Sequence, residues 1–81
     1  MRLDKYLKVS RLIKRRTVAN EACDSSYVSV NGRSVKASYQ VKPGDELCIR
    51  FGTRDVRVRV VSTQEQKLKS EASEMYEIIN E

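Results

Sequence analysis

The spacing of apolar residues predicts two short helices at the start of the chain. Leu3 and Leu7 are four positions apart, so we expect residues 2–9 to form a helix that buries one face. A second helix is expected over residues 17–24, and the positions predicted to face the core are Val18, Ala19, Ala22 and Cys23. Asp4 lies near the positive N-terminal end of the first helix, where it can pair with Lys8.

Alternating apolar and polar residues then predict a small antiparallel sheet. Val28 and Val30 precede Asn31-Gly32, a pair that favours a tight hairpin turn because both residues tolerate a positive φ. Pro43-Gly44 predicts a further turn. Two strands should follow over residues 46–51 and 56–61, and their expected inward-facing side chains are Leu47, Ile49, Phe51, Val56, Val58 and Val60. The expected fold class is therefore α+β, with two N-terminal helices packed on the sheet.

The C-terminal part of the chain has helical spacing of its own. Apolar residues recur from Gln64 onward, at Leu68, Ala72, Met75, Tyr76 and Ile79. We therefore expect a short amphipathic helix within an acidic C-terminal extension, residues 62–81, that follows a domain over residues 1–61.

Charge is distributed unevenly along the 81 residues, which carry a net charge of +5. Residues 1–20 contain seven Lys or Arg and a single Asp, whereas residues 61–81 contain two Lys and five Glu. A basic N-terminal region of this kind is typical of nucleic-acid binding. The chain has neither a run of about 20 apolar residues nor the apolar core of a signal peptide, so we expect a cytoplasmic protein with no membrane partner.

The residue types present argue against an enzyme. The chain has no histidine, which excludes the Ser-His and Cys-His nucleophile systems. Cys23 and Cys48 are too far apart in sequence to form a metal-binding pair, so we expect no metal and no cofactor, and each cysteine should pack as a small apolar residue. Tyr6, Tyr27 and Tyr39 are likewise expected in the core.

The basic residues of the first two helices form the candidate binding site. Arg2, Lys5 and Lys8 step by three along one helix face, and Arg11 extends the line. The run KRR, residues 14–16, meets the N-terminus of the second helix, where free N–H groups also favour phosphate. Arg16 should share an outward face with Asn20. The full set of candidate RNA-binding residues is Arg2, Lys5, Lys8, Arg11, Lys14, Arg15, Arg16, Asn20, Asn31 and Lys36. Asn31 has its primary role in the turn, and Asp4 is expected to hold a nearby arginine in place.

Four segments together resemble the S4 (S-four) RNA-binding domain family, which is named after a small-subunit ribosomal protein. They are RLDKYL, KRRTVANEA, YVSVNGRSVKAS and VKPGDEL, in that order along residues 1–61. The resemblance implies an αL RNA-binding motif, in which the basic face of two helices lies on folded RNA. It also implies an arginine contact at Arg16. Two positions depart from the pattern: Arg15 replaces the usual Ser or Thr before the second helix, where Thr17 could cap instead, and Ser26 replaces a glycine after it.

Within that family the chain is most similar to stand-alone, ribosome-associated members, namely the heat-shock-protein-fifteen-like proteins and above all the RqcP type. This resemblance implies a monomeric, non-enzymatic protein that binds rRNA, and tRNA as well, on large ribosomal subunits obstructed by peptidyl-tRNA. It further implies a role beside an RqcH-type quality-control factor in C-terminal alanine tailing. Two alternatives stay open: an RNA-targeting accessory of an RNA-modifying enzyme or a synthetase, and a DNA-binding protein.

Overall fold

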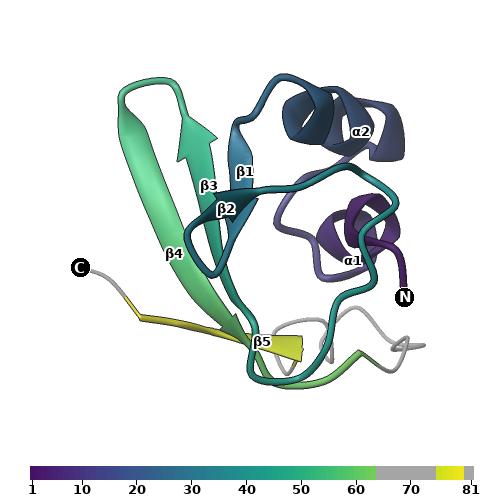
Figure 1. Ribbon diagram of the computed structural model, residues 1–81, viewed down its shortest axis with the longest axis vertical. Helices are drawn as coiled ribbons and strands as arrows, with labels where there is room; N and C mark the ends of the chain where they lie inside the picture. The colour runs from purple at the N-terminus through teal and green to yellow at the C-terminus, as the bar shows by residue number, and fades with distance from the viewer. Residues whose placement is uncertain (64–74, 80–81) are drawn as a thin grey trace.

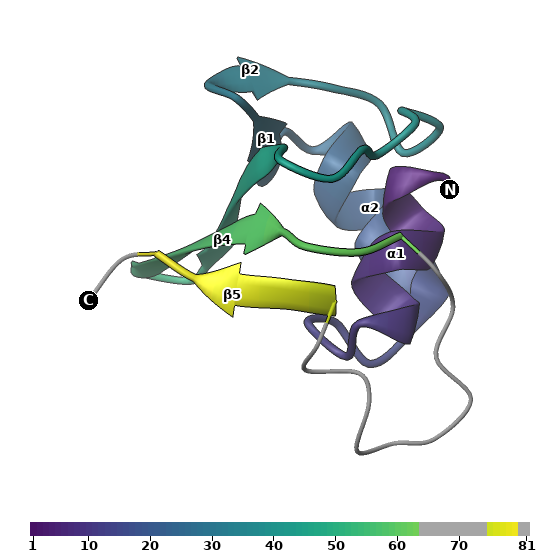
Figure 2. The ribbon, with the colours of Figure 1, turned by 90° about the horizontal axis from the view of Figure 1, so that it is seen from below.

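The computed structural model describes residues 1–63 and 75–79. It contains the helices α1 (Leu3–Val9) and α2 (Arg16–Asp24), and the strands β1 (Val28–Val30), β2 (Arg33–Ser34), β3 (Glu46–Phe51), β4 (Arg54–Val60) and β5 (Tyr76–Ile78). The strands form one antiparallel sheet in the order β2-β1-β3-β4-β5. Both helices lie on the same side of that sheet (Figures 1 and 2). The predicted α+β architecture is confirmed.

The core lies between the helices and the inner face of the sheet. Leu3, Tyr6 and Leu7 bury one face of α1 completely, and Ala19 and Cys23 do the same for α2. The prediction that Val18 faces the core is wrong, because 47% of this residue is exposed. The apolar stripe of α2 is wide enough to include Val18, but only the side centred on Ala19 and Cys23 meets α1 and the sheet.

The two positions that depart from the S4 pattern, Arg15 and Ser26, lie at the two ends of α2. The helix begins at Arg16 with Arg15 as its N-cap and no side-chain cap, so the suggestion that Thr17 caps it is wrong. At the other end Ser26 adopts the left-handed conformation, with φ +63°. The backbone N–H of Ser26 donates to Cys23 O at 3.1 Å, and that of Tyr27 donates to Ala22 O at 2.8 Å. These two bonds form a Schellman motif in which serine occupies the position that glycine usually takes.

The strands follow the predicted alternation over most of their length. Asn31 and Gly32 form the hairpin turn, with φ of +52° and +84°. Leu47, Ile49, Val58 and Val60 are buried and Val56 is half-buried, as predicted. Phe51, however, is 42% exposed rather than buried. It pairs with Arg54 beyond the last residue pair between β1 and β3, where β3 and β4 extend past their neighbours in the described part of the sheet.

The end of the chain differs from the prediction of a C-terminal helix. Residues 64–74 lie outside the described residues, but Tyr76–Ile78 form β5, which pairs with β4, so a helix over these positions is wrong. An edge strand with unpaired backbone groups offers a partner that overrides helical spacing. Met75 is fully buried, and the Tyr6 hydroxyl donates to its carbonyl at 2.6 Å. The division of the chain at residue 61 stays a prediction.

The aromatic and cysteine predictions are confirmed in part. Tyr6 is fully buried and Tyr39 packs against the core, but Tyr27 is 51% exposed, which contradicts the prediction. Tyr27 directly follows the left-handed Ser26 at the end of α2. Its carbonyl accepts the Arg50 N–H at the margin of the sheet. Cys23 is buried and Cys48 half-buried, both as free thiols. Burial, with the nearby Asp4 and Asp24 carboxylates, raises the pKa of Cys23 to about 11, so this thiol stays protonated.

Neither helix in the described part of the chain has the length and apolar content needed to cross a lipid bilayer.

Candidate nucleic-acid interface

The carboxylate of Asp4 is the centre of the candidate interface. Its side chain is 3% exposed, although it is charged. Arg2 donates to it through Nε at 3.2 Å and through Nη2 at 3.3 Å, and Arg16 contacts it through Nε at 3.5 Å. Asn20 Nδ2, at 3.2 Å, and the backbone N–H of Lys5, at 2.8 Å, complete the contacts. One carboxylate therefore joins the start of α1 to the first turn of α2.

These contacts decide the charge state of Asp4. Burial by itself raises the pKa of a carboxyl group, but here it is outweighed. The hydrogen bonds from Asn20 and from the Lys5 backbone, together with the charges of Arg16 and Arg2, lower the pKa of Asp4 below its ordinary value. Asp4 is thus an anion at neutral pH. The prediction that it holds a nearby arginine is confirmed, whereas the suggested pair with Lys8 is not formed.

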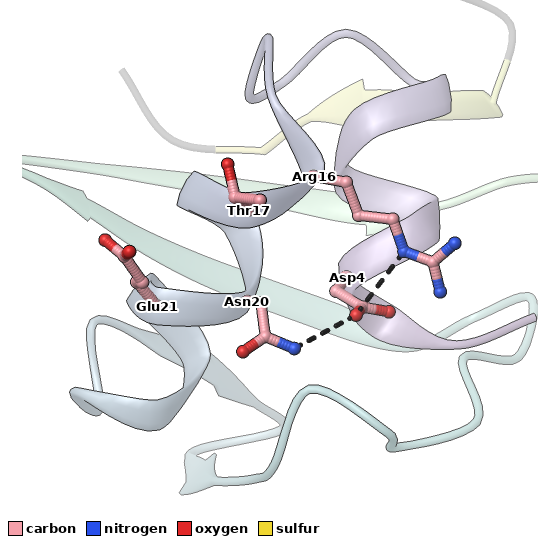
Figure 3. Close-up of a pocket in the computed structure, with 5 residues that line it drawn as sticks. All are labelled: Asp4, Arg16, Thr17, Asn20 and Glu21. Carbon is pink, nitrogen blue, oxygen red and sulfur yellow. Dashed lines mark hydrogen bonds and ion pairs between the residues drawn. The ribbon is translucent and has the colours of Figure 1, made fainter.

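Both arginines keep donors for a ligand while they are held by Asp4. About half of each side chain is exposed, 46% for Arg2 and 49% for Arg16. Figure 3 shows the guanidinium of Arg16 with Nε facing Asp4 and the two terminal nitrogens pointing away. Two guanidinium groups oriented by one buried anion present planar forks of the kind that bind phosphate oxygens in pairs.

The remaining predicted residues of the helical region surround this pair. Lys8 is exposed on α1, and Lys14 and Arg15 are exposed just before α2. Arg11 is exposed where α1 ends and has a left-handed backbone, with φ +67°. Lys5 is half-buried beside Asp4. These basic side chains therefore come from α1, the connection after it and the start of α2, and all but Lys5 are exposed. Asn20 does not point fully outward as predicted, because it is half-buried and bonded to Asp4.

The last two candidates, Asn31 and Lys36, come from the loops around β2. The Asn31 side chain donates to Asp45 at 3.2 Å and accepts the Glu46 N–H at 3.0 Å, so its polar atoms hold the hairpin turn together. Lys36 is exposed and precedes Ala37, whose carbonyl accepts the Asp4 N–H at 3.2 Å. The loop of Lys36 therefore lies against the start of α1, whereas Asn31 is engaged within the turn.

A pocket of about 400 Å³ opens beside the Asp4 centre. Its lining residues are Asp4, Arg16, Thr17, Asn20 and Glu21 (Figure 3). Sequence analysis missed Thr17 and Glu21 as members of the site. The signal was present, because these two residues are four positions apart, as Arg16 and Asn20 are, and the two pairs adjoin on one helix face.

Residues 1–47 match the S4 domain, which covers more than half of the chain. The chain belongs to the S4 domain family. It is 56% identical over all 81 residues to the RQC P-site tRNA stabilizing factor of Bacillus subtilis, covering 94% of that protein. It is 51% identical over its full length to the protein of the same name from Streptococcus pneumoniae, covering 92% of it. The resemblance to the RqcP type that the sequence indicated is confirmed.

The fold of this chain also resembles a solved structure. The trimeric structure of heat shock protein 15 from Vibrio cholerae superposes with a TM-score of 0.90 at 28% sequence identity. The match covers 98% of this chain and 81% of that one. The arrangement of two helices on one face of the sheet is therefore shared with this heat shock protein.

Proposed function

We propose that the protein binds structured RNA of the large ribosomal subunit and stabilises peptidyl-tRNA there during ribosome-associated quality control. One observation carries the proposal: Arg2, at the start of α1, and Arg16, at the start of α2, are both held on the buried Asp4, within a 20-residue segment that carries seven cations. The relatives named RQC P-site tRNA stabilizing factor supply the kind of RNA.

The mechanism is placement rather than catalysis. Folded RNA presents phosphates, 2′-hydroxyls and unpaired bases, and arginine forks at fixed positions bind the phosphates with defined geometry. Because Asp4 orients both guanidinium groups before RNA arrives, little side-chain freedom is lost on binding. Bound in this way, the protein would hold peptidyl-tRNA in place while an RqcH-type factor brings the alanyl-tRNA for C-terminal alanine tailing. It would act as a monomer and without a cofactor.

Four variants test the proposal by co-sedimentation with free large subunits that retain peptidyl-tRNA. We expect Arg2→Ala and Arg16→Ala to reduce ribosome association while thermal melting changes little, since the second arginine, Asn20 and the Lys5 N–H still compensate the buried Asp4. Arg16→Lys should restore only part of the loss, because an ammonium cannot contact Asp4 and a phosphate with separate nitrogens of one fork. The control is Arg57→Ala, on β4, which should matter far less.

Two results would contradict the proposal. If Arg16→Ala associates with ribosomes as well as the wild type does, the arginine pair is not part of the RNA-binding surface. A stronger effect of Arg57→Ala would move the RNA-binding surface to the sheet.

A further inference from the structure

We infer that the pocket beside Asp4 holds one unpaired nucleotide of the RNA and reads its base, with guanine preferred and uracil disfavoured. The inference rests on the proposed function and adds a base preference to a surface otherwise described by charge. The pocket volume of about 400 Å³ falls within the range of roughly 300–1,000 Å³ that is typical of small-molecule sites.

The two ends of the pocket offer opposite chemistry. At one end is Arg16, whose guanidinium is a hydrogen-bond donor and carries positive charge. At the other end are Asn20 and Glu21, which supply acceptors. Because Asn20 Nδ2 donates to Asp4, the amide oxygen is turned away from that carboxylate (Figure 3). Thr17, one turn before Glu21, adds a hydroxyl that can donate or accept.

Attraction between basic side chains and phosphate does not explain why an acidic residue, Glu21, lines this pocket. Within the described residues its exposed carboxylate forms no hydrogen bond or ion pair, although the cation Arg16 lines the same pocket. An unpaired anion on a phosphate-binding face lowers nonspecific affinity for RNA. Its presence in the pocket is explained if it accepts hydrogen bonds from a base, since Glu recognises bases through their N–H donors.

The spacing of the residues suits a single nucleotide. Five positions separate Arg16 from Glu21, which corresponds to about 7.5 Å along the helix axis. Because both residues line the same pocket, a nucleotide whose phosphate contacts Arg16 can extend its base along the pocket toward Glu21. The Watson–Crick edge of guanine carries two adjacent donors, N1–H and the N2 amino group, which match the two oxygens of a carboxylate. Uracil presents carbonyl oxygens on both sides of its N3–H, and these repel a carboxylate. Unpaired bases are the usual sequence-specific targets of RNA-binding proteins.

The test uses the full chain and four RNA hairpins that differ only in one bulged nucleotide, G, A, C or U. Affinities are measured by fluorescence anisotropy at one salt concentration for the wild type, Glu21→Gln, Arg16→Ala and Asp24→Asn. Asp24 is the matched control, because it is an exposed acid on the same helix outside the pocket and its change alters net charge by the same amount. Thermal melting of each variant checks that the fold is retained.

We expect the wild type to bind the bulged-G hairpin about tenfold more tightly than the bulged-U hairpin, in line with a bidentate base contact. Glu21→Gln should abolish that ratio, whereas Asp24→Asn should keep it and tighten binding to all four RNAs. Equal wild-type affinity for the four hairpins, or an unchanged ratio in Glu21→Gln, would overturn the inference. The proposed function would still stand if all four RNAs bind and Arg16→Ala weakens each of them. If Arg16→Ala leaves the affinity for all four RNAs unchanged, both the proposed function and the pocket inference are contradicted.

Discussion

Ser26 holds the backbone at the end of α2 in a conformation that usually belongs to glycine. Its φ of +63° brings Cβ close to the following carbonyl, which destabilises an L-residue relative to glycine. Since the Schellman bonds already satisfy the helix end, we expect Ser26→Gly to raise the free energy of unfolding by roughly 0.5–1 kcal/mol. Urea denaturation measures this. The control is Ser25→Gly, at φ −92°, which should give no gain; equal stability of wild type and Ser26→Gly would contradict the strain argument.

Asp4 should make stability depend on pH in the acidic range. Its pKa is lower in the folded protein than in the unfolded chain, so the unfolded chain binds the proton more readily. The stabilising contribution is therefore complete above about pH 4 and is lost as the pH falls through the folded-state pKa.

The variant Asp4→Asn removes this contribution at every pH. It should cost about 2 kcal/mol at pH 7, since hydrogen bonds to a charged group are lost. The difference from the wild type should shrink as the pH falls below 4. Urea denaturation from pH 2 to 7 measures it, and a constant difference over that range would show that Asp4 does not titrate as described.

At the scale of elements, one side chain links the first helix to the last strand. The Tyr6 hydroxyl, on α1, donates to the carbonyl of Met75, which directly precedes β5. That carbonyl also accepts the N–H groups of Val61 and Ser62, at 2.8 Å and 3.1 Å. It therefore stays satisfied when the hydroxyl is removed.

We accordingly expect Tyr6→Phe to cost only about 1 kcal/mol, the typical net contribution of one hydrogen bond. The loss should appear locally as faster hydrogen exchange at two amides: that of Val61, which donates to Met75 O, and that of Ile79, which follows β5 and donates to Arg57 O on β4. Amides in α2 serve as the internal control. Equal acceleration in α2 and at these two amides would indicate global unfolding instead of local release of β5.

Over the whole molecule, the excess of positive charge lies in the first 20 residues. On β3, β4 and β5, Arg59 pairs with Glu46 and Glu77, and Arg50 pairs with Asp55. Residues 1–20, in contrast, carry seven cations and one anion, Asp4. Under the proposed function, the side formed by α1 and the first turn of α2 therefore attracts RNA.

If that side neutralises about five phosphates, log affinity for RNA should fall against log salt concentration with a slope of about −3 to −5. Filter binding or anisotropy between 50 and 300 mM salt gives the slope. Arg2→Ala should make it shallower by about one. A slope near zero would show that the basic face does not contact phosphates.

The sequence by itself determined the local elements and the positive charge of the candidate interface. Leu3 with Leu7, Val28 with Val30 and Asn31-Gly32 were readable because helix faces, strand alternation and hairpin turns depend on residues within a few positions of one another. The basic residues of the first two helices were readable for the same reason, since their charge is present in any fold.

Only the tertiary structure decided which long-range partners these residues meet. Tyr76–Ile78 became a strand because β4 leaves an edge unpaired, which helical spacing cannot reveal. Val18 and Phe51 are exposed because the core covers only part of α2 and of β3, and Tyr27 is exposed in the connection between α2 and β1. The site depends on the same kind of contact: Asp4 and Arg16, twelve residues apart, share one ion pair only because α1 packs on α2, and this packing creates the pocket that contains Glu21.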